Sequence, residues 1–224
     1  MMEKGASCGL AFGGGQGGWM FGMGSARDHL REATSGAHAR LDRHVVVESL
    51  VSGRMGRTEY SRLLRGYFGW FRHWETAMRE TRAEVVEMLG PERFRRSEWL
   101  AEDLATLGHP SEPLIDEAPA PLDGAALAGQ LYVIEGSTLG GAHLVRAGGG
   151  LPGGASRFYE GYRGNTGPMW KEFLDWLEPE IPSERERDEA AAAATRVFDS
   201  FGGMFDRVVD SACVEEAHRG SDPQ

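Results

Sequence analysis

The sequence LYVIEGSTLGGAHLVRAGGG, residues 131–150, has apolar side chains in helical phase, but three glycines interrupt it within six residues. They are Gly136, Gly140 and Gly141, and each costs about 1 kcal/mol relative to alanine inside a helix. Gly136 and Gly140 share one helical face, with Tyr132 one turn before them. That face allows a flat ligand to approach the backbone, or the helix to bend at the glycine pair. A tight contact between two helices, or a helix that stops before the pair and restarts, would also explain the glycines.

The other periodic segments also have helical phase, and no stretch alternates as a strand would. Ser25 is placed to cap a first helix through ARDHLREATSGAHARLDRHV, with Asp28 at the position of a capping-box acid. Thr58 is placed to cap a long aromatic-rich helix over residues 59–85, and Gly108 closes a third helix, RSEWLAEDLATLG. We therefore predict an all-α, single-domain bundle of six or seven helices.

Composition and charge restrict the class of protein. The chain has 224 residues and a formal net charge of -10, which argues against a basic surface for nucleic acid or an anionic membrane. No apolar run approaches the roughly 20 residues of a membrane span. Its two cysteines, Cys8 and Cys213, do not form a disulfide framework, so a reducing cytoplasm is the simplest location.

The two ends of the chain are expected to lie outside the fold. Residues 1–24 are rich in glycine and lack the basic start and apolar core of a signal peptide, so we expect a flexible tail or a stretch translated ahead of a true start at Met23. Residues 213–224 are expected to be a frayed C-terminal tail. The helical domain is therefore predicted to span residues 25–212.

His38 is the histidine whose neighbours favour a ligand. It lies beside the apolar stripe of the first helix, and the small residues Thr34, Gly36 and Ala37 leave room for a bulky planar group. Arg31 lies two turns earlier on nearly the same face, roughly 10 Å away, where a cation suits a carboxylate at the rim of a ligand. A core histidine with satisfied hydrogen bonds and a solvated surface arginine are the alternatives.

The pattern Leu-Arg-Glu-Ala-Thr-x-x-x-His over residues 30–38, followed about a hundred residues later by YVIEGSTLGGAHL, resembles heme oxygenase. The similarity is to the bacterial, biliverdin-producing branch found with phytochromes, and it extends from about residue 26 to about residue 212. It implies cleavage of heme b, as both cofactor and substrate, by O₂ and electrons to biliverdin, carbon monoxide and iron. The implied partners are a ferredoxin or reductase as electron donor and a bacteriophytochrome that receives biliverdin.

The resemblance also assigns residues to the two faces of heme. His38 would be the iron ligand on one face, which leaves the opposite axial position open for O₂. The glycine helix would cover that opposite face, where Gly136 and Gly140 let the backbone approach the macrocycle. Gly141, with Gly140, would form a hinge for product release.

Three further residues belong to the cofactor-binding set that the resemblance implies. Arg31 would meet a heme propionate, and Tyr132 precedes the first site glycine by one turn. Arg196 resembles the family's basic residues at the open edge of heme. A surface salt bridge accounts for Arg196 equally well.

The glycine helix departs from the animal enzymes at two positions. Ser137 stands where they have an aspartate that anchors ordered water, and Val133 stands where they have an arginine. Ser137 and Thr138 are able to hold water or to bond back to helix carbonyls. Ser137 is expected to serve catalysis together with Gly136 and Gly140.

Two other classes of function remain open. One is a non-catalytic heme-binding or heme-trafficking protein that keeps His38 and has lost turnover. The other is a helical protein of similar fold that binds a different cofactor, although no Glu/His metal constellation on facing helices is evident.

Overall fold

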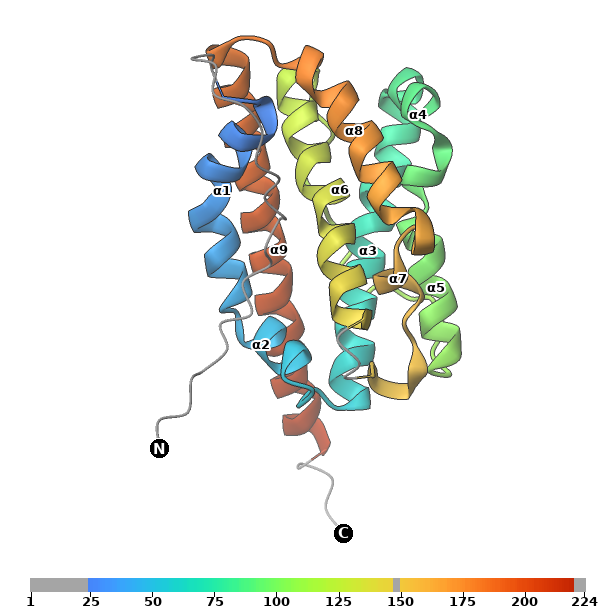
Figure 1. The fold of residues 1–224 in the computed structure, drawn as a ribbon. Helices are drawn as coiled ribbons and strands as arrows, with labels where there is room; N and C mark the ends of the chain where they lie inside the picture. Colours follow the sequence, from blue (N-terminus) through green and yellow to red (C-terminus); the bar gives the residue numbers. More distant parts are fainter. Residues whose placement is uncertain (1–23, 147–149, 220–224) are drawn as a thin grey trace.

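The computed structural model describes residues 24–146 and 150–219, and it confirms the predicted all-α class (Figure 1). No strand occurs within those ranges. The α-helices are α1 (Ala26–Asp42), α2 (Val45–Val51), α3 (Arg57–Thr81), α4 (Ala83–Leu89), α5 (Arg96–Thr106), α6 (Gly124–Arg146), α7 (Arg157–Glu160), α8 (Thr166–Glu180) and α9 (Glu184–Arg219). Short 3₁₀ helices join them at η1 (Pro91–Phe94), η2 (Pro152–Gly154) and η3 (Arg163–Asn165).

The first helix begins where the sequence predicts, because the Ser25 hydroxyl oxygen accepts a hydrogen bond from the backbone N–H of Asp28 at 3.1 Å. It ends earlier than predicted, at Asp42. His44 caps a separate helix, α2, by accepting the backbone N–H of Val46 at Nδ1, 3.2 Å away. The prediction of one helix through residue 45 was therefore wrong, because the His44 side chain satisfies an amide that would otherwise be free.

The second predicted helix is also divided. Helix α3 begins at Arg57, and the carboxylate of Glu59 accepts the backbone N–H of Gly56 at 2.7 Å, so the predicted cap Thr58 lies inside the first turn. The helix ends before Arg82, whose guanidinium donates to the carbonyl of Leu122 at 2.9 Å. The break between α3 and α4 thus coincides with a contact to a distant loop, which local sequence does not encode.

The C-terminal helix is longer than expected. Helix α9 continues through Arg219, whereas a frayed tail was predicted from residue 213. The segment CVEEAHR contains neither glycine nor proline, and the next residue along the chain is Gly220, so no stop signal precedes the end of the helix. Residues 220–224, and the N-terminal tail as far as residue 23, lie outside the described residues. Over the described ranges, no helix has the length and apolar character needed to span a membrane.

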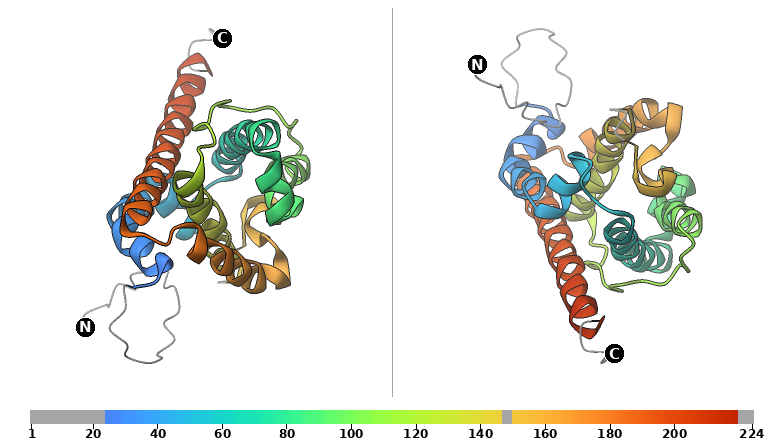
Figure 2. Two further views of the ribbon diagram at one scale, coloured as in Figure 1. Left: turned by 90° about the horizontal axis from the view of Figure 1, so that it is seen from above. Right: turned by 90° about the horizontal axis from the view of Figure 1, so that it is seen from below.

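Helix α9 holds the two helices of the predicted site. It packs against α1 and against α6, which lie on either side of it when the molecule is viewed from above (Figure 2). Helix α6 approaches α9 closely at Gly129, where a Cβ atom would lie 1.9 Å from the carbonyl oxygen of Ala190. The approach is possible because glycine has no side chain. Helices α7 and α8 cover α6 from another side.

Helix α3 supplies the aromatic part of the core. Its Trp70, Phe71 and Trp74 are fully buried, and the rings of Trp70 and Trp74 stack 6.3 Å apart. Phe201 of α9 packs on Trp70 with ring centroids 4.5 Å apart. These large side chains fix α3 against α9 and thereby the scaffold on which α1 and α6 are mounted.

Candidate functional site

His38 lies near the end of α1 and pairs with a carboxylate on the same helix. Its Nδ1 atom is 3.0 Å from Oδ2 of Asp42, one turn later, and the two side chains are 27% and 35% exposed. In the tautomer that carries its proton on Nδ1, the imidazole donates to this carboxylate and its Nε2 atom is available to bind a metal. Asp42 was not identified from the sequence, although its spacing of four residues after a histidine was the signal available.

The imidazole of His38 is held from a second side by α9. Phe198 contacts it edge to face, with ring centroids 5.5 Å apart and an interplanar angle of 68°. Earlier in α1, the hydroxyl of Thr34 donates to the carbonyl of Leu30 at 2.7 Å, so this buried polar group is satisfied within the helix. These contacts hold the His38 side of α1 in place, and the contact with the Asp42 carboxylate uses Nδ1 and not Nε2.

At the other end of α1, Arg31 and Tyr132 come into electrostatic range. Burial raises the pKa of Tyr132 to about 12, and Arg27 and Arg31 oppose that rise. The phenol is therefore neutral near pH 7 and faces two cations of α1. Arg31 itself is half-exposed, and its guanidinium lies 3.7 Å from the carboxylate of Asp28 in a loose ion pair.

Tyr132 and Gly136 share Trp170 of α8 as a neighbour. The rings of Tyr132 and Trp170 are 5.8 Å apart, and a Cβ atom built at Gly136 would meet Trp170 at 3.7 Å, an ordinary contact. The structure thus brings Tyr132 into electrostatic range of Arg31 and places Tyr132 and Gly136 beside the same tryptophan. Trp170 was not identified from the sequence.

The site glycines of α6 have different surroundings. The helix is continuous through Gly140 and Gly141, so it neither stops before the pair nor restarts after it. A Cβ atom at Gly141 would lie 3.0 Å from the carbonyl oxygen of Tyr159 in α7, so tight packing explains that glycine. Gly136 has no such crowding among the described residues, and half-buried Gly140 follows it by one turn. Packing of the described residues leaves Gly136 unexplained.

Both hydroxyls of the glycine segment bond back to their own helix. Ser137 donates to the carbonyl of Ile134 at 2.7 Å, and Thr138 donates to the carbonyl of Glu135 at 2.6 Å. Ser137 is exposed and Thr138 is buried. Because a hydroxyl that donates keeps its lone pairs, the Ser137 oxygen is still able to accept a hydrogen bond from water.

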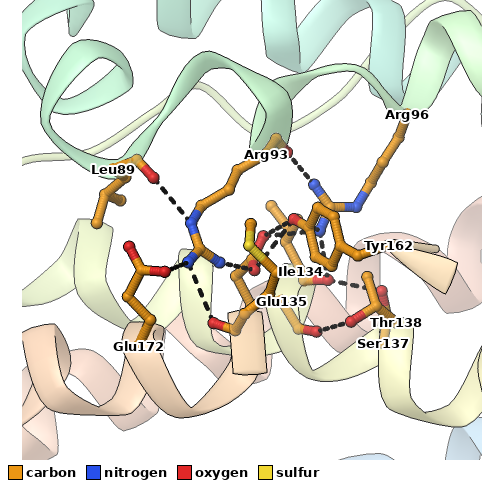
Figure 3. A network of polar contacts seen from close by, with 10 residues as sticks. Leu89, Arg93, Arg96, Ile134, Glu135, Ser137, Thr138, Tyr162 and Glu172 are labelled. Carbon is orange, nitrogen blue, oxygen red and sulfur yellow. Dashed lines mark hydrogen bonds and ion pairs between the residues drawn. The ribbon is translucent and has the colours of Figure 1, made fainter. Parts of the chain in front are cut away.

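Glu135, directly before the first site glycine, is the centre of a buried ionic cluster (Figure 3). Its two oxygens accept from Arg93 at 2.6 Å and from Arg96 at 2.7 Å, and the Tyr162 hydroxyl bonds to both. The Glu135, Arg93 and Arg96 side chains are only 1–2% exposed. Burial alone would lower the pKa of Arg96, but Tyr162 and Glu135 outweigh it and raise that pKa, so the guanidinium stays charged. A glutamate within an apolar helix was the overlooked signal.

Arg196 and His143 stand apart from these groups. Both side chains are exposed, on α9 and α6 respectively. Within the described ranges, no hydrogen bond or ion pair joins Arg196 to another predicted site residue. Its assignment to the site remains a prediction.

The family model described as Heme oxygenase matches residues 25–207. A heme oxygenase of Xanthomonas campestris pv. campestris is 30% identical over 160 residues, covering 70% of this chain and 94% of the relative. The heme oxygenase PigA of Pseudomonas aeruginosa is 29% identical over 196 residues, covering 82% of this chain and 95% of the relative.

Solved structures of the same fold come from other bacteria. The heme oxygenase of Leptospira interrogans superposes with a TM-score of 0.65 at 20% identity, covering 81% of this chain and 98% of that one. Heme oxygenase-1 of the cyanobacterium Synechocystis sp. PCC6803, in complex with heme, gives a TM-score of 0.59 at 17% identity, covering 88% and 100%.

Proposed function

Because the chain belongs to the heme oxygenase family and is a heme-degrading oxidoreductase, we propose that it opens heme to biliverdin, carbon monoxide and iron, with His38 as the iron ligand. The observation that carries this assignment is the 3.0 Å contact between Nδ1 of His38 and Asp42. It holds the proton on Nδ1 and presents the lone pair of Nε2, the arrangement that ligating histidines usually have.

The remaining residues fit a planar dicarboxylate ligand. Gly136, whose neighbours do not account for the missing side chain, leaves room over one face of a macrocycle. Arg31 and the neutral hydroxyl of Tyr132 suit a carboxylate at its rim, one as a cation and the other as a hydrogen-bond donor. Gly140 extends the same face by one turn.

Heme, when bound, supplies the iron at which O₂ reacts and is also the substrate whose ring is opened. The protein supplies one neutral nitrogen from His38, a cationic rim at Arg31 and a face without side chains at Gly136 and Gly140. The Ser137 oxygen would accept a hydrogen bond from water, because the hydroxyl proton is donated to the carbonyl of Ile134. This water would take the place of the one that an aspartate holds in the animal enzymes.

The partners follow from the family resemblance. Electrons would come from a ferredoxin or a reductase, with Arg196 among the basic residues near the heme edge. Biliverdin would pass to a bacteriophytochrome in the cytoplasm. Gly141, which packs on Tyr159, would contribute to the same cofactor-binding helix without touching the ligand.

A non-catalytic heme carrier is the second candidate. Ser137, which stands at the position of the aspartate and donates to its own helix, favours this candidate. A serine offers a hydrogen-bond acceptor but lacks the negative charge of an aspartate. The two functions differ in one measurement. An enzyme converts the Soret absorption of bound heme into biliverdin absorption when reductant and air are added, and a carrier leaves the heme intact.

Heme titration without oxygen, followed by reductant and air, tests the proposal. We expect a histidine-ligated spectrum and then biliverdin. His38→Ala should lose that spectrum, whereas the exposed His143→Ala should keep it. An unchanged imidazole-ligated ferrous–CO spectrum in His38→Ala would show that the ligand is another residue.

A further inference from the structure

The buried cluster around Glu135 is not used by the proposed function. Its carboxylate accepts from two arginines that come from η1 and α5, 42 and 39 residues away in sequence. Two guanidinium groups and a carboxylate have lost their water here, and such buried pairs are often no more stable than well-packed apolar residues. A gain in stability is therefore a weak explanation for the cluster, and a role in positioning the neighbouring turn of α6 is the alternative.

The arginines are themselves fixed by backbone groups. Arg93 donates through Nε to the carbonyl of Leu89 at 2.9 Å and through Nη2 to the carbonyl of Met169 at 3.1 Å. Arg96 donates through Nη1 to the carbonyl of Arg93. Because carbonyl groups at the end of α4, in η1 and in the first turn of α8 accept from these two side chains, Glu135 is tied to a rigid frame (Figure 3).

The cluster reaches the site through one carbonyl group. The carbonyl oxygen of Ile134 accepts from Nη2 of Arg96 at 3.3 Å and from the Ser137 hydroxyl at 2.7 Å. The same Arg96 nitrogen contacts Glu135 at 2.7 Å. The carboxylate, the guanidinium, the carbonyl and the Ser137 hydroxyl are therefore linked in series, and Gly136 lies within the turn they enclose.

We infer that Glu135 is a positioning residue that fixes the turn 134–137 of α6 and, through Arg96 and the Ile134 carbonyl, the orientation of the Ser137 hydroxyl. This inference rests on the proposed function, in which that turn faces heme. Rotation or sliding of the turn would break two buried ion pairs at once. The cluster thus keeps the glycine face and the serine oxygen at a constant height above the ligand.

The substitution Glu135→Gln tests this role because it keeps the shape of the side chain and removes its charge. Glu75→Gln is a matched control. Glu75 is also fully buried, but its carboxylate bonds to the backbone N–H of Arg96 and to Ser97 at the start of α5, with no hydrogen bond to α6. Both variants lose a buried carboxylate, and only one loses a bond to the glycine helix.

Three quantities should be measured on the full chain. The first is amide hydrogen exchange over residues 134–141 of the apo-protein, the second is the dissociation constant of heme, and the third is the single-turnover rate of biliverdin formation. In Glu135→Gln we expect exchange to rise and the rate to fall by about tenfold or more, because a misplacement of about 1 Å far from the chemistry can cost about a hundredfold. Heme affinity should change by less than about threefold. Glu75→Gln should show neither the local exchange nor the rate effect.

Tyr162→Phe keeps the test decisive if Glu135→Gln does not fold. It removes a hydroxyl 2.9 Å from Glu135 and retains the ring, which packs edge to face on Trp99. We expect the same two changes, smaller in size. Folded variants with wild-type exchange over residues 134–141 and wild-type turnover would overturn the positioning role, as would equal losses in Glu75→Gln. Failure of the wild-type protein to open heme would instead overturn the proposed function.

Discussion

Asp42 lies one helical turn after His38, and its Oδ2 atom is 3.0 Å from Nδ1 of the imidazole. A carboxylate in this position sets which ring nitrogen carries the proton and makes the other nitrogen a stronger donor to a metal. The spacing of four residues within one helix brings the two side chains together, and Phe198 of α9 holds the imidazole from its other side.

Asp42→Asn should therefore weaken heme binding or turnover by about tenfold, the lower end of the range for such outer-shell partners. The amide oxygen still accepts from Nδ1, so His38 should remain the ligand, but the loss of charge should lower the iron–histidine stretching frequency in resonance Raman spectra. Asp199→Asn is the control, because Asp199 pairs with Arg40 on the outside of the same helix pair. An unchanged stretching frequency would show that Asp42 does not influence the iron ligand.

Arg31→Glu should weaken heme binding and change the proportions of the biliverdin isomers. A charge-assisted bond to a propionate is worth about 1.5 to 3 kcal/mol, and at this half-exposed position screening favours the lower value. Heme titrations and chromatography of the products measure the two effects. Arg185→Glu, an exposed substitution in the first turn of α9, should leave both unchanged. The same affinity and isomer mixture in Arg31→Glu would remove this residue from the rim.

Gly136→Ala should leave the apo-protein stable and reduce heme turnover. The new Cβ atom meets Trp170 at an ordinary 3.7 Å, and alanine improves helix propensity by about 1 kcal/mol. Gly129→Ala is the contrast, because its Cβ atom would lie 1.9 Å from the backbone of α9 and should cost about 1 to 3 kcal/mol by overpacking. Thermal melts of the apo-proteins and single-turnover rates separate the two kinds of glycine. A destabilised Gly136→Ala with normal turnover would assign that glycine to packing.

Alkaline titration should distinguish Tyr132 from the other tyrosines. Burial raises the pKa of all five, and that of Tyr132, at about 12, is the lowest. At pH 11 an ordinary phenol is about nine-tenths ionised, whereas the folded apo-protein should show little phenolate absorption until denaturant is added. Because the Tyr132 pKa is raised, its contribution to stability is complete below pH 10 and is lost as the pH rises through about 12. The first phenolate to appear should be missing in Tyr132→Phe.

Local sequence was sufficient for the helical class, for the cap at Ser25 and for the end of the third helix at Gly108, which has a φ of +75°. These features depend on contacts between residues a few positions apart. At Thr58 the cap was misplaced although its signal was local, because Glu59 accepts from Gly56 three residues earlier. Local sequence was insufficient at residue 82, where Arg82 donates to the carbonyl of Leu122, 40 residues away. The His38 motif could be recognised from the sequence alone. The proximity of the Tyr132 phenol to the Arg31 cation could not, because it depends on how α1 and α6 are placed relative to each other.

The sequence by itself determined that this chain forms helices, that one of them carries a histidine among small residues, and that another lacks side chains on one face. Tertiary structure alone decided what each glycine and charge does. Gly129 and Gly141 pack closely against the backbones of α9 and α7, whereas Gly136 packs against neither backbone. Glu135 pairs with arginines from another part of the chain. The reason is physical: helix propensity and capping act within a turn or two along the chain. Close approach and ion pairing depend on surfaces that become neighbours only when the helices pack.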